Sequence, residues 1–216
     1  MDCVFFGRKT GWLVVRDPHQ KINVYWSEIN RETMSEYQCA RDTLESMGFE
    51  IKAVVVDGKP GLARLFGDLP IQMCHFHMKQ IITYHLTRKP KLEAGVELRM
   101  LTHILCNTNE AEFSTALASW HEKWGKFLKE RTVDEATGRW HYTHRRLRAA
   151  YRSLTSHLPY LFTYQRNMEL HIPNTTNSLD GSFAHLKQLV LIHRGLKQDL
   201  KRKMILSILQ NSNTKS

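Results

Sequence analysis

The sequence has no long hydrophobic run and few cysteines. No stretch approaches the roughly 18 consecutive apolar residues that a membrane span needs, and no signal peptide opens the chain. The four cysteines are scattered, a pattern that favours a reducing compartment over the disulfide framework of small secreted proteins. We therefore expect a soluble cytoplasmic protein with no membrane partner.

Acidic residues are also scarce relative to basic ones. The 216 residues include 21 Asp and Glu against 31 Lys and Arg, which gives a formal net charge of +10. The excess gathers in two places, Arg145, Arg146 and Arg148 with Arg152, and residues 197–203. A basic balance of this kind favours a polyanionic partner, with nucleic acid as the leading candidate, although charge also serves solubility.

The first fifty residues predict a small sheet covered by a helix. Residues 2–6, 11–16 and 22–29 have the composition of short strands, and turn residues separate them. Connections this short imply an antiparallel meander. Residues 33–47 then carry apolar side chains at helical spacing and stop at Gly48, which predicts an amphipathic helix packed on the sheet.

The next elements extend the predicted sheet. Residues 51–56 are apolar at nearly every position, as in a central strand buried on both faces, and a helix over 60–66 and a strand over 71–74 follow. This order of strands and helices is that of an RNase H-like sheet. In that arrangement the first and fourth strands are neighbours.

The middle of the chain predicts helices alone. Residues 78–164 contain apolar positions at helical spacing and no convincing strand, with a loop over 132–138. A helix over 174–190 follows, and the polar run 174–177 is expected to cap it. We therefore expect three segments: a first part of the core (1–80), a helical insertion (81–168) and closing helices of the core (169–216).

Three acids stand where these elements begin or end. Asp2 opens the first strand, Asp57 closes the strand over 51–56, and Asp180 lies early in the helix over 174–190. Carboxylates at the ends of buried strands must be paired, hydrogen-bonded or bound to metal, and three of them suggest a hard-cation site for phosphoryl transfer. Taken singly, Asp57 is also typical of a turn and Asp180 of a helix first turn.

Lys187 falls on the same predicted helix stripe as Asp180, two turns further on. A cation there is suited to hold a DNA phosphate beside the metal site. A solvated lysine on an amphipathic helix explains the position equally well.

These residues resemble a known family. The opening strand with Asp2, together with residues 55–62, 72–77 and 174–181, resembles the catalytic domain of Mutator-like DDE transposases, in particular those of bacterial insertion sequences. The motifs occur in the family's order, and the resemblance extends from residue 2 to about 206. In the family the third acid is usually Glu, so Asp180 is a departure that shortens this side chain by one methylene.

The resemblance implies a fold, an activity and partners. The fold is α/β, an RNase H-like mixed sheet with a helical insertion before the last catalytic helix. The activity is metal-dependent DNA strand cleavage and strand transfer, with Asp2, Asp57 and Asp180 holding two Mg²⁺ (or Mn²⁺). The partners are double-stranded DNA, as element ends and target, and further copies of the chain that form a homo-oligomer on DNA, so a nucleoid-associated protein is expected.

Two other groups have expected roles. Arg145, Arg148 and Arg152 recur at helical spacing, and we expect this face to bind the DNA backbone without reading sequence. Cys74 and His77 match a C-x-x-H signature of the family. One Cys–His pair is half of a structural Zn²⁺ site and no matching pair occurs elsewhere, so the pattern favours a structural motif over zinc.

The resemblance also leaves alternatives. Family members carry an amino-terminal DNA-binding region ahead of the first acid, whereas this sequence begins one residue before Asp2, so a fragment is expected. A catalytically decayed copy, or an RNase H-like nuclease that binds DNA, is one alternative. A zinc-organised nucleic-acid-binding module built on Cys74, His75 and His77 is another.

Overall fold

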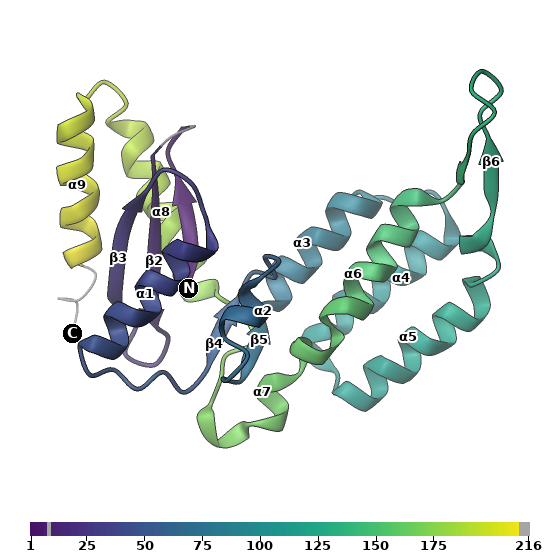
Figure 1. Cartoon of the computed structure of the whole chain (residues 1–216), viewed down its shortest axis with the longest axis horizontal. Coiled ribbons are helices and arrows are strands. Elements are labelled where there is room, and N and C mark those ends of the chain that lie inside the picture. Colours follow the sequence, from purple (N-terminus) through teal and green to yellow (C-terminus); the bar gives the residue numbers. More distant parts are fainter. Residues whose placement is uncertain (8–9, 212–216) are drawn as a thin grey trace. The chain divides into compact units, whose positions relative to one another are not determined.

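The protein divides into two compact units (Figure 1). The structure, a computed structural model, describes residues 1–7 and 10–211. The first unit comprises Met1–Ile71 and Thr176–Ser216, and the second is the continuous segment Gln72–Thr175. The expected helical insertion, 81–168, falls inside the second unit. The architecture is mixed α/β, with small sheets.

Most elements of the first unit lie where the sequence predicts them. The three strands of the meander and the helix over 33–47 are confirmed, and Thr33 caps that helix by accepting the Glu36 N–H at 3.4 Å. The elements are β1 (Asp2–Phe5), β2 (Gly11–Asp17), β3 (Ile22–Ile29), α1 (Met34–Ser46), β4 (Val54–Val56), α2 (Leu62–Leu65), α8 (Asn177–Ile192) and α9 (Gln198–Asn211).

The antiparallel meander β1-β2-β3 is sandwiched between helices. Side chains alternate between its faces, so Val4 and Trp12 share one face while Cys3 points to the other. The first face packs against α8 and α9 in one apolar cluster that includes Phe183. On the opposite face, Cys3 Sγ lies 3.5 Å from the hydroxyl of Tyr37 on α1.

The sequence predicts that the first and fourth strands lie side by side in one sheet. In the structure β1 and β4 belong to different sheets. β4 forms a separate two-stranded sheet with β5 (Ile71–Met73), and a hydrogen bond from Val54 N–H to Pro70 O at 3.0 Å accompanies this pairing. β4 covers only the last half of the predicted strand, and Lys52, in the half that is not strand, is exposed. The Met1 amino group still donates to Val55 O at 3.1 Å.

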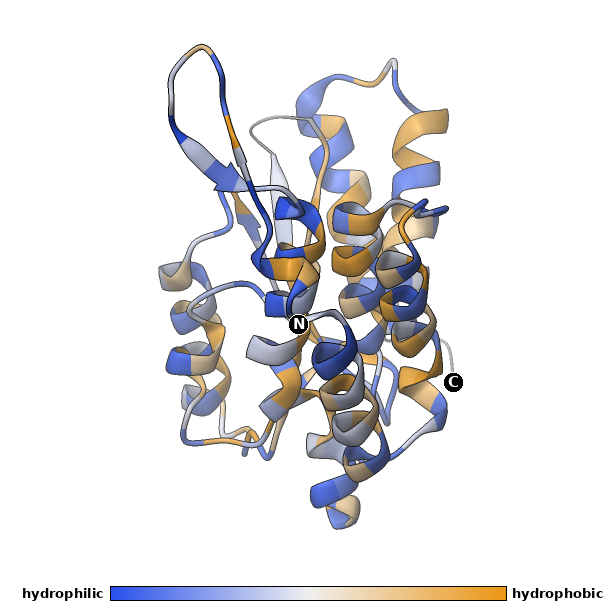
Figure 2. Ribbon diagram, turned by 90° about the vertical axis from the view of Figure 1, so that its right-hand side faces the viewer, coloured by the Kyte–Doolittle hydropathy of each residue, from blue (hydrophilic) through white to orange (hydrophobic). Residues whose placement is uncertain are grey.

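The second unit is a bundle of helices around its own core. The core contains Leu98, Phe113, Leu154 and Phe162, each without exposed surface. In the hydropathy-coloured ribbon the helices alternate between hydrophobic and hydrophilic sides, as amphipathic helices with one buried face do (Figure 2). The main helices are α3 (His75–Leu86), α4 (Glu93–Ile104), α5 (Glu110–Trp124) and α6 (Arg145–Leu161), followed by the short α7 (Thr163–Arg166).

The prediction of helices alone over 78–164 is wrong. A hairpin of β6 (Arg131–Val133) and β7 (Trp140–Tyr142) extends from the bundle (Figure 1). Its strands are short and mostly exposed, so they carry no alternation of buried and exposed residues that the sequence could reveal. The Arg131 guanidinium lies 4.0 Å from the Trp140 ring centroid and stabilises the pairing.

The start of α8 also differs from the expectation. The helix begins at Asn177 rather than at residue 174, and its N-cap Thr176 makes no side-chain capping bond. The Asn174 carbonyl instead accepts the N–H of His75 at 2.9 Å, so this polar run serves another contact. Among the described helices, none is both long and apolar enough to cross a membrane.

Candidate functional site

Asp2 and Asp180 come together from opposite ends of the first unit's sequence. Asp2 lies on the same face of β1 as Val4, the face against which α8 packs. Leu179, the neighbour of Asp180, is part of that packing. As a result, a carboxylate oxygen of Asp2 and one of Asp180 lie within 4.8 Å of each other, and both side chains are half-buried.

Local hydrogen bonds hold both carboxylates. The Cys3 N–H donates to Asp2 Oδ1 at 2.7 Å, and the Thr176 hydroxyl donates to Asp180 Oδ2 at 2.8 Å. The Asp180 N–H bonds to Thr176 O at 3.0 Å in the first turn of α8. These bonds orient the two carboxylates.

Asp57 follows β4 and turns back on the backbone. Its Oδ1 accepts the N–H of Lys59 at 3.0 Å, the Asx-type turn that the sequence offers as an alternative reading. Among the described residues, no group with ligand atoms all within 4.8 Å joins Asp57 to Asp2 and Asp180. The role of Asp57 as a metal ligand therefore stays a prediction.

Asp57 nevertheless follows a strand that lies close to the start of β1, because the Met1 amino group donates to Val55 O. Burial raises the pKa of the Cys3 thiol to about 12, and the negative charges of Glu32, Asp2 and Asp57 add to that rise against the opposing Tyr37 hydrogen bond. Glu32 pairs with the Lys59 ammonium at 3.2 Å. Asp2 and Asp57 therefore act on the same side chain, and the first unit places three acids around β1.

The pair Asp2 and Asp180 suits a hard divalent cation. Carboxylate oxygens are the ligands that Mg²⁺ and Mn²⁺ prefer, and two oxygens bound to one Mg²⁺ lie about 3 to 4 Å apart. The carboxylate oxygens of Asp2 and Asp180 lie within 4.8 Å of each other, close to that separation. A shared cation would also relieve the repulsion between two negative charges at this distance.

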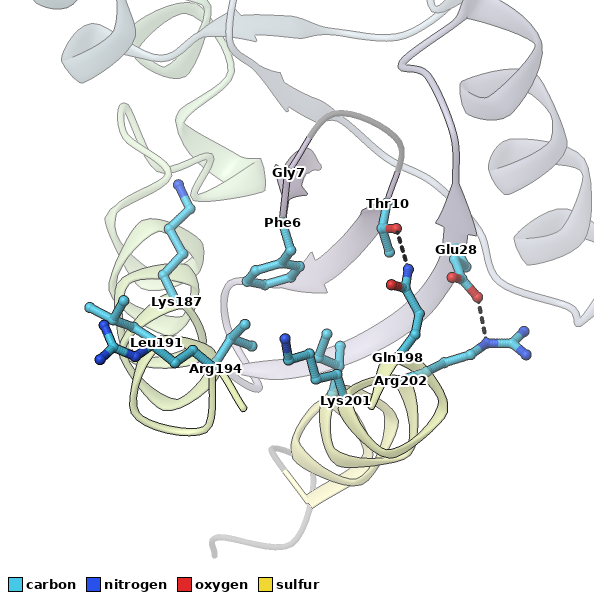
Figure 3. A pocket seen from close by; sticks show the side chains of 12 residues that line it. Phe6, Gly7, Thr10, Glu28, Lys187, Leu191, Arg194, Gln198, Lys201 and Arg202 are labelled. Atoms are coloured by element: carbon cyan, nitrogen blue, oxygen red, sulfur yellow. Dashed lines mark hydrogen bonds and ion pairs between the residues drawn. The ribbon is translucent and has the colours of Figure 1, made fainter. Parts of the chain in front are cut away.

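A second feature of the first unit is a basic pocket of about 360 Å³ lined by residues of α8 and α9 and by residues next to the facing ends of β1 and β2, Phe6, Gly7 and Thr10 (Figure 3). Lys187, predicted to bind DNA, is exposed and lines it. Three further lining cations were not singled out one by one by the sequence: Arg194, Lys201 and Arg202. The basic run 197–203 was the signal for two of them.

The predicted DNA-binding arginines of α6 divide into two kinds. Arg145 and Arg152 are exposed, and the structure shows no ion pair for either with a described residue. Arg148 is half-buried: its guanidinium donates to Leu128 O at 2.7 Å and lies 3.5 Å from the Tyr142 ring centroid. Arg148 therefore fastens the hairpin to the bundle, and its binding to DNA stays a prediction.

Cys74 and His77 occupy the start of α3. Cys74 is the N-cap residue and is fully buried, while His77 lies half-buried in the first turn. Within the described part of the second unit, no three His, Cys or acidic side chains offer ligand atoms within 4.8 Å of one another. His75 is committed elsewhere, since its Nε2 lies 2.6 Å from Leu161 O and burial lowers its pKa.

Comparisons with known proteins add no assignment. The chain matches no protein-family model, and neither the comparison with curated proteins nor that with solved structures finds a match.

Proposed function

We propose that this chain is the catalytic part of a DDE-type transposase with an RNase H-like core. It would cleave DNA strands and join them to a target in a divalent-metal-dependent reaction, as the sequence resemblance implies. The observation that carries the proposal is the approach of Asp2 and Asp180 within 4.8 Å, because these are the first and third acids of the family's motif.

The proposal assigns a role to each part of the site. Asp2 and Asp180 hold Mg²⁺ or Mn²⁺, and Asp57, near β1, completes the ligands. When bound, the metal supplies an activated oxygen nucleophile and neutralises charge at the leaving oxygen. The protein's own contribution is to orient the carboxylates through Cys3 N–H and the Thr176 hydroxyl.

The charge of the protein fits a DNA substrate. The formal net charge of +10 and the exposed Arg145, Arg152 and Lys187 provide contacts for phosphates that need no base recognition. Homo-oligomerisation on DNA remains part of the proposal through the family resemblance alone.

The test combines strand cleavage with metal binding. We expect Asp180→Asn to abolish Mn²⁺-dependent nicking of supercoiled DNA and to weaken Mn²⁺ binding, measured by titration, at least about tenfold, because one ligand charge is lost with almost no change in volume. Asp180→Glu should keep or increase nicking, because Glu is the family's usual third acid. Removal of the metal with EDTA should stop the reaction.

Asp199→Asn is the matched control. Asp199 also lies in the first turn of a helix of the first unit, α9, and should leave nicking and Mn²⁺ binding unchanged. Equal nicking by the Asp180→Asn protein and the unmodified protein would contradict the third-ligand assignment. If only Asp180→Glu nicks DNA, the natural chain is a decayed copy that retains the fold.

A further inference from the structure

The basic pocket described above combines an apolar wall with unneutralised cations. Phe6, Val190, Leu191 and Ile205 supply the apolar side of the lining. Leu191 is 67% exposed, so the wall is open to a ligand rather than closed by the protein's own packing. A pocket of about 360 Å³ lies in the size range of small-molecule sites.

Three of the lining cations are available to an anion. Arg202 is neutralised by Glu28, with Nε and Oε2 2.5 Å apart. Lys187, Arg194 and Lys201 make no ion pair with any acid in the described part of the chain. The first turn of α9 also lies at the pocket, where the positive end of the helix dipole favours negative charge.

A hydrogen bond between two polar side chains lies at one end of the pocket. Gln198 Nε2 donates to Thr10 Oγ1 at 3.1 Å, which fixes the amide and leaves its oxygen facing the remaining lining (Figure 3). Figure 3 places Lys187 and Leu191 of α8, with Arg194 just beyond the end of that helix, on one side and the α9 residues on the other, with Phe6 between them. A ligand that fits is therefore flat and apolar in one part and anionic in another.

We propose that this pocket binds one nucleotide of a single DNA strand. Lys187, Arg194 and Lys201 contact the phosphate, and the base lies against Phe6 and Leu191. Aromatic and aliphatic walls stack bases of any sequence, and cations track the backbone beside them. The choice of DNA over other amphipathic anions rests on the proposed function, whereas the pocket itself involves none of the three acids.

Two matched pairs of variants test the pocket on the full chain. Leu191→Glu places a charge in the pocket, while Ile192→Glu places the same charge on the next residue, which is 64% exposed and does not line it. Lys201→Ala removes a lining cation, and Lys203→Ala removes an exposed cation of the same helix outside the lining. All four positions have solvent access, so folding should be preserved, and circular dichroism checks this.

Binding is measured in EDTA by fluorescence anisotropy with a short labelled oligothymidylate and with an abasic strand of the same length. The unmodified protein should bind the thymidylate at least about fivefold more tightly than the abasic strand, because a stacked base contributes that much. Leu191→Glu should remove this preference and Ile192→Glu should keep it. Lys201→Ala should weaken binding about three- to tenfold and lower the salt slope by about 0.7, with less than about twofold change for Lys203→Ala.

Several outcomes would overturn the proposal. Two results would show that the strand binds through unspecific charge attraction and not in the pocket. One is an equal loss of affinity in Leu191→Glu and Ile192→Glu, and the other is equal affinity for the thymidylate and the abasic strand. If free thymidine monophosphate competes at concentrations as low as those of the strand, the ligand of the pocket is a free nucleotide and not a DNA strand. Leu191-dependent binding to phosphatidylserine vesicles, with strand binding unchanged, would assign the pocket to a lipid. Because EDTA removes the metal, the result is separate from the cleavage test of Asp180.

Discussion

At the scale of single residues, the hydroxyl of Thr176 determines what Asp180 does. A first-turn aspartate commonly faces solvent and contributes a few tenths of a kcal/mol to its helix, about 0.3 to 1. Here the side chain is half-buried and held at 2.8 Å by the residue that precedes the helix. That contact holds the Asp180 carboxylate close to Asp2, so under the proposed function an Asp at this position is long enough to share a metal with Asp2.

Cys3 gives a prediction that needs no DNA. Its thiol pKa, raised to about 12 mainly by burial, keeps it protonated and unreactive at neutral pH, and Cys74 is fully buried. Cys39 is exposed. Alkylation of the folded protein at pH 8, followed by peptide mass spectrometry, should label Cys39 first. Faster labelling of Cys3 would contradict this account of its environment.

The raised pKa of Cys3 also determines how the stability of the protein changes with pH. The folded-state pKa of Cys3 lies above the ordinary thiol value of 9.0, so at high pH the folded protein keeps a proton that the unfolded chain loses. The contribution is fully present below pH 9 and is lost as the pH rises toward 12. Urea midpoints should therefore fall over this window, and Cys3→Ser, which does not titrate there, should reduce the fall.

At the scale of elements, replacing two glycines by alanine is expected to change the stability of the protein in opposite directions. Gly61 adopts φ +100° next to α2, and a Cβ there would lie 2.8 Å from Met34 Sδ. Gly181 lies inside α8 with open space around its Cβ position. We expect Gly61→Ala to destabilise the protein by at least about 1 kcal/mol and Gly181→Ala to stabilise it by up to about 1 kcal/mol, measured by urea denaturation. Equal effects of the two changes would show that backbone conformation does not decide their cost.

The elements differ in how far the sequence predicts them. The meander and α1 follow from local alternation, helical spacing and turn residues, which act over a few positions. The hairpin was missed because its strands depend on contacts such as Arg131 over Trp140 rather than on a buried face. Its turn did leave a signal: Asp134 Oδ1 accepts the N–H groups of Ala136 and Thr137, and Gly138 has φ +65°.

The candidate site depends on contacts that are distant in sequence. Burial patterns could suggest where Asp2 and Asp180 stand in their elements, but their approach depends on how α8 packs on β1. The grouping of these acids into one site was predicted from their places in the elements and from the family resemblance, not from any local pattern of contacts. The position of Asp57 depends on the separate β4-β5 sheet, which local periodicity does not reveal. The pocket cations of α8 and α9 likewise gather through tertiary packing.

At the scale of the whole molecule, the second unit is one continuous segment inserted into the sequence of the first unit. The second unit, Gln72–Thr175, has its own core and its own ordered contacts, such as the Trp120 indole N–H that donates to Ala94 O at 3.0 Å. The first unit is completed only when Thr176 and the following residues return to it. Such an arrangement lets the inserted segment fold without the strands that carry the acids.

We therefore expect residues 72–175 to fold when produced alone. The fragment should show a helical circular dichroism spectrum and a cooperative urea transition, because its core residues all lie within it. Leu98→Ala should lower the fragment's free energy of unfolding by about 2 to 5 kcal/mol, since Leu98 has no exposed surface. The control Val96→Ala, on the same helix and 39% exposed, should cost less than about 1 kcal/mol. A fragment that unfolds without cooperativity would show that this core needs the first unit, and equal costs for the two changes would show that α4 is not packed as described.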